Sequence, residues 1–238
     1  MPNDFFEFKK FRIKQDKCAM RVSTDAVLLG AWTSTNGSKY ILDIGTGTGV
    51  IALMMAQKSE ARIVAIDIDK ESYEQALTNV QESNYADRIS VIHCAFQDFV
   101  QEQSQKFNLI VTNPPYFIDS LKSNTGSRTI ARHTDTLSFD DLISGVKKIL
   151  HEKGKFCLIL PKNEAETFRS KAEAHGLYLS KLMRVRTTTE KSSEKRHLMQ
   201  FEFKESEFSE STLIIEADSH RNYTAEYKAL TKDFYINF

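Results

Sequence analysis

Residues 40–58 read YILDIGTGTGVIALMMAQK, and this stretch decides the fold class of the chain. Its first five residues (40–44) are an apolar run that predicts a buried strand, and residues 49–58 predict a helix that follows directly. Three of the nine glycines lie between them. Gly45 and Gly47 allow a tight turn and a close approach of the backbone to a ligand, and the helix directs free N–H groups into the same space. The stretch therefore predicts a ligand-binding loop between a strand and a helix.

The same alternation of strand and helix continues along the chain. Near-continuous apolar strands that alternate with helices are typical of a parallel sheet covered on both faces. The last two strands have no good helix between them, which predicts an antiparallel hairpin at the edge of the sheet. The predicted strands are 40–44, 62–68, 89–94, 107–112, 154–161, 177–187 and 197–204, and the predicted helices after the first are 70–83, 139–150 and 162–176.

Local signals fix details of three helices. In the helix at 70–83, a spacing of i, i+3, i+4 and i+7 predicts one buried face. Ser138 is placed to cap the next helix, and Gly176 is placed to end the last one. The predicted buried face consists of Tyr73, Ala76, Leu77 and Val80.

Length and composition favour one globular domain. The 238 residues are 41% hydrophobic and 27% charged, which supports a sizeable core. We expect a single domain over residues 1–238, with an N-terminal extension (1–38), a Rossmann-like core (39–204) and a C-terminal extension (205–238). The polar segment 118–137 predicts a long functional loop.

Nothing in the sequence predicts a membrane span, a signal peptide or a metal site. No apolar run approaches the roughly 20 residues that a spanning helix needs. The N-terminal segment is charged, which does not fit a secretory signal. The three cysteines lie far apart without a C-x-x-C pair, so we expect no metal and three reduced thiols in a cytoplasmic protein.

An acidic residue completes the glycine loop. Asp67 lies 22 residues after Gly45, at the end of the second predicted strand, where a carboxylate can accept hydrogen bonds from both hydroxyls of a ribose. The loop is neither G-x-G-x-x-G nor a P-loop. With Asp43 before it, the arrangement resembles the nucleoside-binding half of class I methyltransferases, which use S-adenosylmethionine. The resemblance implies that Asp43, Gly45 and Gly47 lie against the methionine part of this cofactor and that Asp67 holds the ribose.

One position departs from this pattern. Enzymes of this class often place an acid after the third strand to bind the adenine amino group, and this chain has Ala95 there. Either Asp98 binds the adenine from further along, or backbone groups do so alone.

The stretch IVTNPPYF (110–117) ends the fourth predicted strand with two adjacent prolines. An exocyclic amine is a poor nucleophile because its lone pair is delocalised into the π-system. The side-chain oxygen of Asn113 and the carbonyl of Pro114 can accept its two N–H bonds and localise that lone pair. Proline fixes the backbone that aims the carbonyl, and Tyr116 offers a face for stacking. The motif predicts methyl transfer to a planar amine.

Three further stretches narrow the family. FKKFRIKQDKCAMRVSTDAVLLGAW (8–32), ARHTDTLSFDDL (131–142) and the C-terminal YTAEYKALTKDFYINF, together with NPPYF, resemble the bacterial tRNA1(Val) adenine N6-methyltransferases over nearly the whole chain. The resemblance implies methylation of N6 of adenine 37, next to the anticodon, with S-adenosylmethionine. It also implies that Thr24 and Asp25 help to close the cofactor pocket, and that Phe117, Arg132 and His133 lie near the substrate. For His133, an ordinary loop histidine that contacts the backbone is an equally good interpretation.

The expected partner is the anticodon stem-loop region of tRNA, with no membrane and no obligatory protein partner. The net charge is zero, but residues 1–21 carry six Lys/Arg against three acids, and residues 181–204 carry seven against three. These basic segments and the 118–137 loop are therefore expected to hold the RNA. The expected phosphate contacts are Arg12, Lys14, Arg128, Arg132, Arg184 and Arg186.

Three other functions fit the sequence less well. The N-P-P-Y motif also occurs in enzymes that methylate the glutamine amide of release factors. Those enzymes usually carry an N-terminal helical domain, and only 38 residues precede the predicted core (39–204) here. A DNA adenine methylase would need a target-recognition domain that is not evident. A catalytically silent RNA-binding or assembly protein of this fold would be expected to have lost Asn113 or the glycines.

Overall fold

The computed structural model describes residues 3–18, 20–114, 137–189, 193–217 and 221–238, and the structural statements below concern these residues. The strands, in chain order, are β1 (Phe5–Glu7), β2 (Arg12–Lys14), β3 (Tyr40–Ile44), β4 (Arg62–Asp67), β5 (Ile89–His93), β6 (Phe107–Thr112), β7 (Leu150–Pro161), β8 (Tyr178–Thr188), β9 (Glu194–Glu202) and β10 (Ser209–Glu216).

The helices alternate with these strands. They are α1 (Thr24–Trp32), α2 (Val50–Lys58), α3 (Lys70–Gln81), α4 (Phe96–Glu102), α5 (Phe139–Ile149), α6 (Lys162–Ala174) and α7 (Ala225–Thr231). In this part of the chain, no helix is long and apolar enough to cross a membrane.

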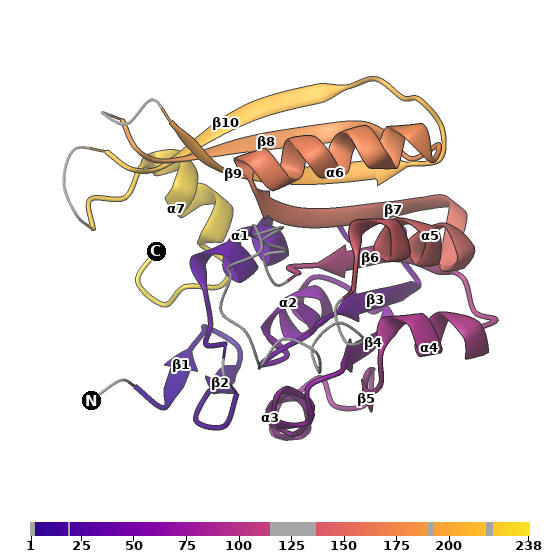
Figure 1. Cartoon of the computed structure of the whole chain (residues 1–238). Helices are drawn as coiled ribbons and strands as arrows, with labels where there is room; N and C mark the ends of the chain where they lie inside the picture. Colours follow the sequence, from indigo (N-terminus) through magenta and orange to yellow (C-terminus); the bar gives the residue numbers. More distant parts are fainter. Residues whose placement is uncertain (1–2, 19, 115–136, 190–192, 218–220) are drawn as a thin grey trace, which may run out of the picture.

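A mixed sheet of eight strands organises the molecule (Figure 1). Its order is β10-β8-β9-β7-β6-β3-β4-β5. The strands from β5 to β7 are parallel, whereas β9 is antiparallel to both β7 and β8. The predicted α/β class I methyltransferase fold is confirmed, because the seven predicted strands form this sheet with the β8–β9 hairpin in it.

The eighth strand changes one detail. β10 pairs in parallel with β8, so the hairpin does not form the edge of the sheet. The first four residues of β10 are polar and exposed, so the sequence gives little sign of a strand there. It is a strand through its backbone pairing with β8, which needs no apolar pattern.

Two apolar clusters cover the two faces of the sheet. One contains residues of α1, α2 and α7, with Ile41, Leu109 and Leu198 from the sheet. The other contains residues of α4, α5 and α6, with Leu42, Ile110 and Met199. Neighbouring residues of one strand therefore point into different clusters, as the twofold period of a strand requires.

The predicted helix ends are confirmed. The Ser138 hydroxyl accepts a hydrogen bond from Asp141 N at 3.1 Å. Gly176 follows α6 with a φ of 76°, the left-handed conformation that favours glycine.

The predicted face of α3 is partly wrong. Ala76 and Val80 are buried, but Tyr73 and Leu77 are only half-buried. The buried face instead includes the polar residues Gln75 and Asn79, so it is rotated from the apolar spacing. The reason is a tertiary contact with the N-terminal segment, which hydrogen bonds to these amides.

Both chain ends pack on the same face of the sheet (Figure 1). Phe8, next to β1, stacks on Tyr235 with ring centroids 6.1 Å apart. Lys9 Nζ donates to the carbonyls of Lys232 and Phe238 at 2.6 and 2.7 Å. The elements predicted from the sequence did not include β1, β2, α1, α4, β10 or α7.

Candidate functional site

The glycine loop between β3 and α2 leaves open space beside its backbone. Gly45 and Gly47 have φ values of 68° and 56°, a conformation that residues with a Cβ rarely adopt. A Cβ on either glycine would have no heavy atom of the described residues within 4 Å. The loop therefore borders a space that these residues do not fill.

Hydrogen bonds fix this loop from two sides. Gly45 N and Thr46 N both donate to Ile66 O, at 2.9 and 3.0 Å, and Gly47 N donates to Asp67 Oδ2 at 2.8 Å. From the other side, Asn79 Nδ2 donates to Thr48 O at 2.9 Å. The N–H groups of residues 45–47 are thus used inside the protein, whereas the expected free donors belong to the first turn of α2.

Asp43 is a fully buried carboxyl group below the loop. Its Oδ2 accepts hydrogen bonds from Thr46 Oγ1 at 2.7 Å and Ala52 N at 3.2 Å. Its Oδ1 has no partner among the described residues. Burial raises the pKa of Asp43 to about 7, and the charge of Asp67 adds to this rise. A cation bound nearby would favour the ionised carboxylate.

Asp67 ends β4 and is 9% exposed. Its Oδ2 binds Gly47 N, and its Oδ1 accepts a hydrogen bond from Asp69 N at 2.9 Å. Burial raises the pKa of Asp67 despite these bonds. Each carboxylate oxygen has a further lone pair, so the group can still accept hydroxyl donors. The next residue, Ile68, is 49% exposed and gives an apolar surface that was not predicted from the sequence.

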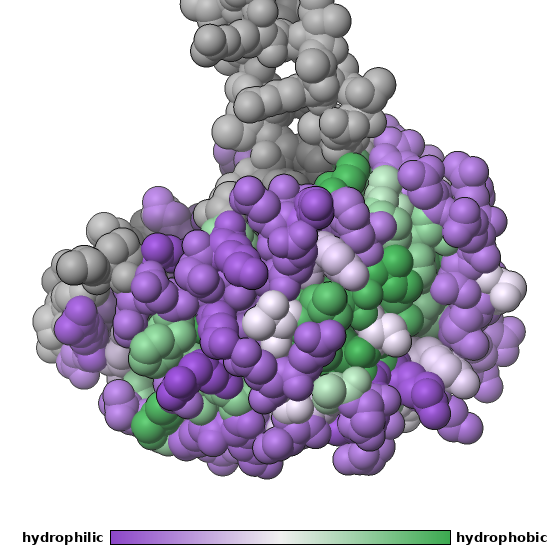
Figure 2. Space-filling view, turned by 90° about the horizontal axis from the view of Figure 1, so that it is seen from below, coloured by the Kyte–Doolittle hydropathy of each residue, from purple (hydrophilic) through white to green (hydrophobic). Residues whose placement is uncertain are grey.

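Figure 2 shows the molecule from below the view of Figure 1, where the surface is mostly hydrophilic and contains an apolar patch. Ile68 and Ile92, at the ends of β4 and β5, are among the exposed large apolar residues. Ala95, at the position where enzymes of this class often have an acid, is the N-cap of α4. Asp98 is exposed in the first turn of this helix.

The end of β6 lies beside the glycine loop. Thr112 pairs with Ile44 of β3, and Thr112 Oγ1 donates to Ile44 O at 2.8 Å. Asn113 follows Thr112 at the end of β6, and Gly45 follows Ile44 at the end of β3. Asn113 is half-buried and Pro114 is buried. Tyr116, Phe117, Arg132 and His133 lie outside the described residues.

Thr24 and Asp25 form the first turn of α1, which Ser23 caps through Ala26 N. Asp25 Oδ2 accepts a hydrogen bond from Arg196 Nε at 2.6 Å, and the two side chains are 17% and 27% exposed. Arg196 pairs with Pro161, three residues beyond the residue of β7 that pairs with Thr112. This ion pair therefore lies toward the same carboxyl ends of the parallel strands as Asn113. No spacing in the sequence reveals it, since its members are 171 residues apart.

Several of the predicted phosphate contacts are already in ion pairs. Arg12 binds Glu7 at 2.5 Å, Lys14 binds Glu82 at 2.6 Å, and Arg184 binds Glu194 at 3.1 Å and also Glu210. Arg186 donates to Thr189 O at 2.9 Å. Exposed pairs of this kind contribute about 0–1 kcal/mol, so a phosphate can compete for these side chains. Arg128 lies outside the described residues.

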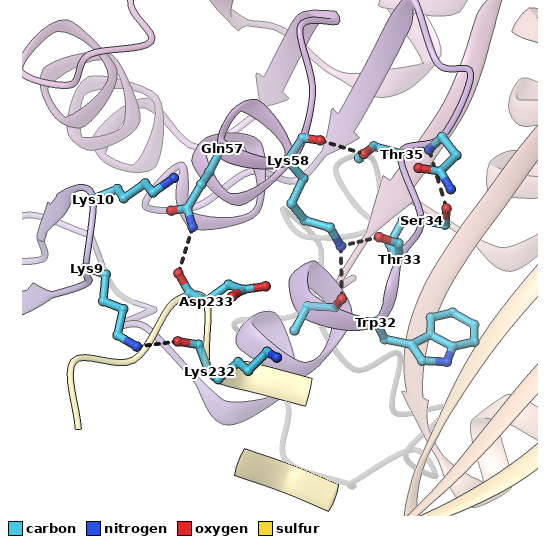
Figure 3. Close-up of a pocket in the computed structure, with 12 residues that line it drawn as sticks. Lys9, Lys10, Trp32, Thr33, Ser34, Thr35, Gln57, Lys58, Lys232 and Asp233 are labelled. Atoms are coloured by element: carbon cyan, nitrogen blue, oxygen red, sulfur yellow. Dashed lines mark hydrogen bonds between the residues drawn. The ribbon is translucent and has the colours of Figure 1, made fainter. Parts of the chain in front are cut away.

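A cavity of about 590 Å³ lies near the other end of α2 (Figure 3). It is bordered by the ends of α1 and α2 and by Lys9, Lys10, Lys232 and Asp233. Lys58 Nζ donates to the carbonyls of Gly30 and Ala31, at 3.0 and 2.9 Å, and of Thr33. Burial lowers the pKa of Lys58 to about 8. The amine donates hydrogen bonds to carbonyls at the C-terminal end of α1, which is a structural role.

The described residues contain no group of three or more His, Cys, Asp or Glu side chains that could hold a metal ion. All three cysteines are free thiols.

Comparisons with known proteins identify the family. Residues 23–167 match the family model of the methyltransferase small domain. A Phocaeicola vulgatus protein named tRNA1(Val) (adenine(37)-N6)-methyltransferase is 47% identical over 238 residues, which covers 100% of both chains. A Flavobacterium psychrophilum protein of the same name is 44% identical, over 97% of this chain and 99% of its own.

Solved structures show the same fold. A predicted O-methyltransferase from Agrobacterium tumefaciens has a TM-score of 0.69 at 17% identity, over 88% of this chain and 96% of its own. TrmK of M. capricolum, solved with S-adenosyl-homocysteine, has a TM-score of 0.53 at 15% identity, over 81% and 71%. The matched family model and the full-length relatives together place this chain in the tRNA1(Val) (adenine(37)-N6)-methyltransferase family, on a methyltransferase small domain.

Proposed function

We propose that this enzyme methylates N6 of adenine 37 in the anticodon loop of tRNA1(Val). The observation that carries the proposal is the pairing of Thr112 with Ile44, because it sets Asn113 next to the glycine loop. The full-length relatives named for this reaction support the choice of substrate over a release factor.

The residues at the loop fit S-adenosylmethionine. The open space beside Gly45 and Gly47 accommodates a ligand that approaches the backbone closely. Asp67 would hold the ribose hydroxyls, and Asp43, with its unpartnered Oδ1, would favour a cationic group near the loop. Thr24 and Asp25 would close the pocket from α1. Either Asp98 or backbone groups would bind the adenine. Bound S-adenosylmethionine supplies an electrophilic methyl group on a sulfonium centre.

Asn113 and Pro114 would orient the substrate amine. Their oxygens accept its two N–H bonds, so the lone pair of the nitrogen points toward the methyl group. Such preorganised acceptors need no general base before transfer, since the proton can leave afterwards. Tyr116 would stack on the adenine, and Phe117, Arg132 and His133 would contact the substrate. These four side chains lie outside the described residues and come from the sequence alone.

We also propose that the enzyme acts in the cytoplasm and binds the anticodon stem-loop region without an obligatory protein partner. Its three free thiols are typical of a reducing compartment. Each lost phosphate contact, for example in Arg186→Ala, should reduce the slope of log affinity against log salt by about one unit.

The deciding experiment supplies purified enzyme and methyl-labelled S-adenosylmethionine with tRNA, with double-stranded DNA or with a release factor. We expect label on tRNA, in N6-methyladenine at position 37. Label on the release factor without label on RNA would replace this proposal with glutamine methylation.

Replacing Asn113 tests the catalytic assignment. Asn113→Ala removes an acceptor that is matched to the transition state, so turnover should fall about 10²–10³-fold, as when an oxyanion-hole donor is lost. Cofactor affinity, measured by calorimetry, should change little. The control is Asn108→Ala on the same strand, because Asn108 Oδ1 binds Lys39 N and Tyr40 N at the other end of β6. Near-normal turnover of Asn113→Ala would make Asn113 a turn residue only.

A further inference from the structure

Two buried amide side chains on α3 have no role in the function described above. Gln75 and Asn79 are each 1% exposed, although residues of this kind are mostly found at the surface. They are four residues apart and therefore lie on the same face of the helix. Buried polar groups persist where they are hydrogen bonded, so their partners indicate what they do.

Asn79 joins two distant segments of backbone through one amide. Its Oδ1 accepts a hydrogen bond from Lys14 N at 2.8 Å, and its Nδ2 donates to Lys14 O at 2.9 Å. The same Nδ2 donates to Thr48 O, in the glycine loop, at 2.9 Å. Lys14 lies 65 positions from Asn79, and Thr48 lies 31 positions from it. One side chain thus holds the end of β2 against the loop.

Gln75 holds the residues that follow β2. Its Oε1 accepts a hydrogen bond from Lys17 N at 2.9 Å. We call the segment Lys14–Cys18 the strap. The two amides thus hold the strap against α3 at Lys14 and at Lys17.

We propose that Asn79 is a positioning residue for S-adenosylmethionine, which fixes the glycine loop and the strap in the arrangement that receives the cofactor. The inference rests on the proposed placement of the cofactor at this loop. Asn79 does not need to touch the cofactor, because it acts through Thr48 and Lys14.

The loop needs this support for a geometric reason. Gly45 and Gly47 have no side chains to hold them, and their N–H groups are bound only on the β4 side, by Ile66 and Asp67. The bond from Asn79 to Thr48 O fixes the opposite side. A loop that samples several conformations binds in proportion to the fraction in the competent one, so loss of this bond should weaken cofactor binding.

A matched pair of variants separates positioning from burial. Asn79→Asp keeps the acceptor for Lys14 N but replaces the donor to Thr48 O and Lys14 O with an oxygen. Gln75→Glu places the same charge at the same depth on the same helix face and keeps the acceptor for Lys17 N. Both variants should lower the melting temperature, but only Asn79→Asp should weaken cofactor binding, by about tenfold or more in calorimetric titration. At saturating cofactor, kcat should stay near normal, because Asn113 is intact.

A second pair of variants, both uncharged, keeps the test informative if the charged variants do not fold. Asn79→Ser removes the bridge without burying a charge, and Gln75→Ser is its match. Hydrogen exchange adds a readout that stability alone would not move. The cofactor should slow exchange in residues 14–18 and 45–49 in the wild type and in Gln75→Glu, and much less in Asn79→Asp and Asn79→Ser.

The reference variant is Asp67→Ala. If Asp67→Ala weakens cofactor binding but the Asn79 variants bind as their Gln75 partners do, Asn79 is a structural residue and the inference is overturned. If Asp67→Ala also binds normally, the placement of the cofactor itself is wrong.

Discussion

Each end of α2 has an ionisable group, the buried Asp43 at one end and the half-buried Lys58 at the other, and the two groups differ in how many of their polar atoms are hydrogen bonded. At the N-terminal end, Asp43 has one oxygen without a partner among the described residues and lies below glycines that border open space. At the C-terminal end, Lys58 donates to three carbonyls (Figure 3). Each charge has the sign that the helix dipole favours at its end.

The difference separates a ligand site from a structural one. A buried charge that is hydrogen bonded throughout stabilises the fold and has no need of a ligand. A buried polar atom without a partner costs free energy, and next to unfilled space it indicates a group that arrives from outside. Trp32 Nε1 and Gln57 Oε1, which line the cavity in Figure 3, also lack a partner among the described residues. The two ends of α2 are therefore distinguished by their ionisable groups, and only the group at the glycine-loop end has an unpartnered oxygen.

The largest effect should follow a change at the glycine-loop end. Asp67→Ala leaves ribose hydroxyls unpaired and frees Gly47 N, so cofactor affinity should fall by about 1–3 kcal/mol, or up to roughly 100-fold. Calorimetric titration measures it. The control is Asp69→Ala, since the exposed Asp69 carboxylate caps α3 through Ser72 N instead of binding the loop. Equal affinity in both variants would remove the distinction between the ends of α2.

Lys58→Met tests the structural end. The variant leaves the carbonyls of Gly30, Ala31 and Thr33 without their donor, so the free energy of unfolding should fall by about 2 kcal/mol. Cofactor affinity should stay unchanged. Denaturant unfolding measures the first quantity and calorimetry the second, with Lys10→Met as the control because Lys10 borders the same cavity and is exposed. A cofactor defect in Lys58→Met would show that the two ends are coupled.

The smallest effect concerns pH. Asp43 has a pKa of about 7 in the folded protein against an ordinary value of 3.8. Between these values the folded chain binds more protons than the unfolded chain, so this group makes stability fall as pH rises from about 4 to 7. Asp43→Asn cannot ionise, so relative to the wild type it should gain about 1 kcal/mol between pH 5 and pH 6. Unfolding curves at both pH values measure this, and a constant difference would mean that Asp43 titrates normally.

The core of the fold and the glycine loop between β3 and α2 could be predicted because their signals are local. The strand at 40–44, its glycines and Asp67 follow one another in sequence, and parallel strands bring their carboxyl ends to one edge. Strand order alone therefore puts Asn113 at the same edge as Gly45. Ser138 and Gly176 also carry local signals, and both act as predicted.

Features that depend on distant segments could not be predicted. The apolar run of β10 is only three residues long (213–215), and the polar first half joins the sheet through its backbone pairing with β8. The face of α3 is set by a segment about 60 positions earlier, which buries Gln75 and Asn79 in place of Tyr73 and Leu77.

The sequence by itself determined the α/β class, the loop with its two aspartates, and the position of Asn113 after β6, because each depends on adjacent residues or on strand order. Only the tertiary structure decided that Asn79 hydrogen bonds to both the strap and the loop, and that Arg196 pairs with Asp25. The same holds for the hydrogen bonds from Lys58 to the last carbonyls of α1. These are contacts between polar groups far apart in the chain. Hydrophobic periodicity reports which side of an element is buried, but it does not report which buried hydrogen-bonding partners will meet.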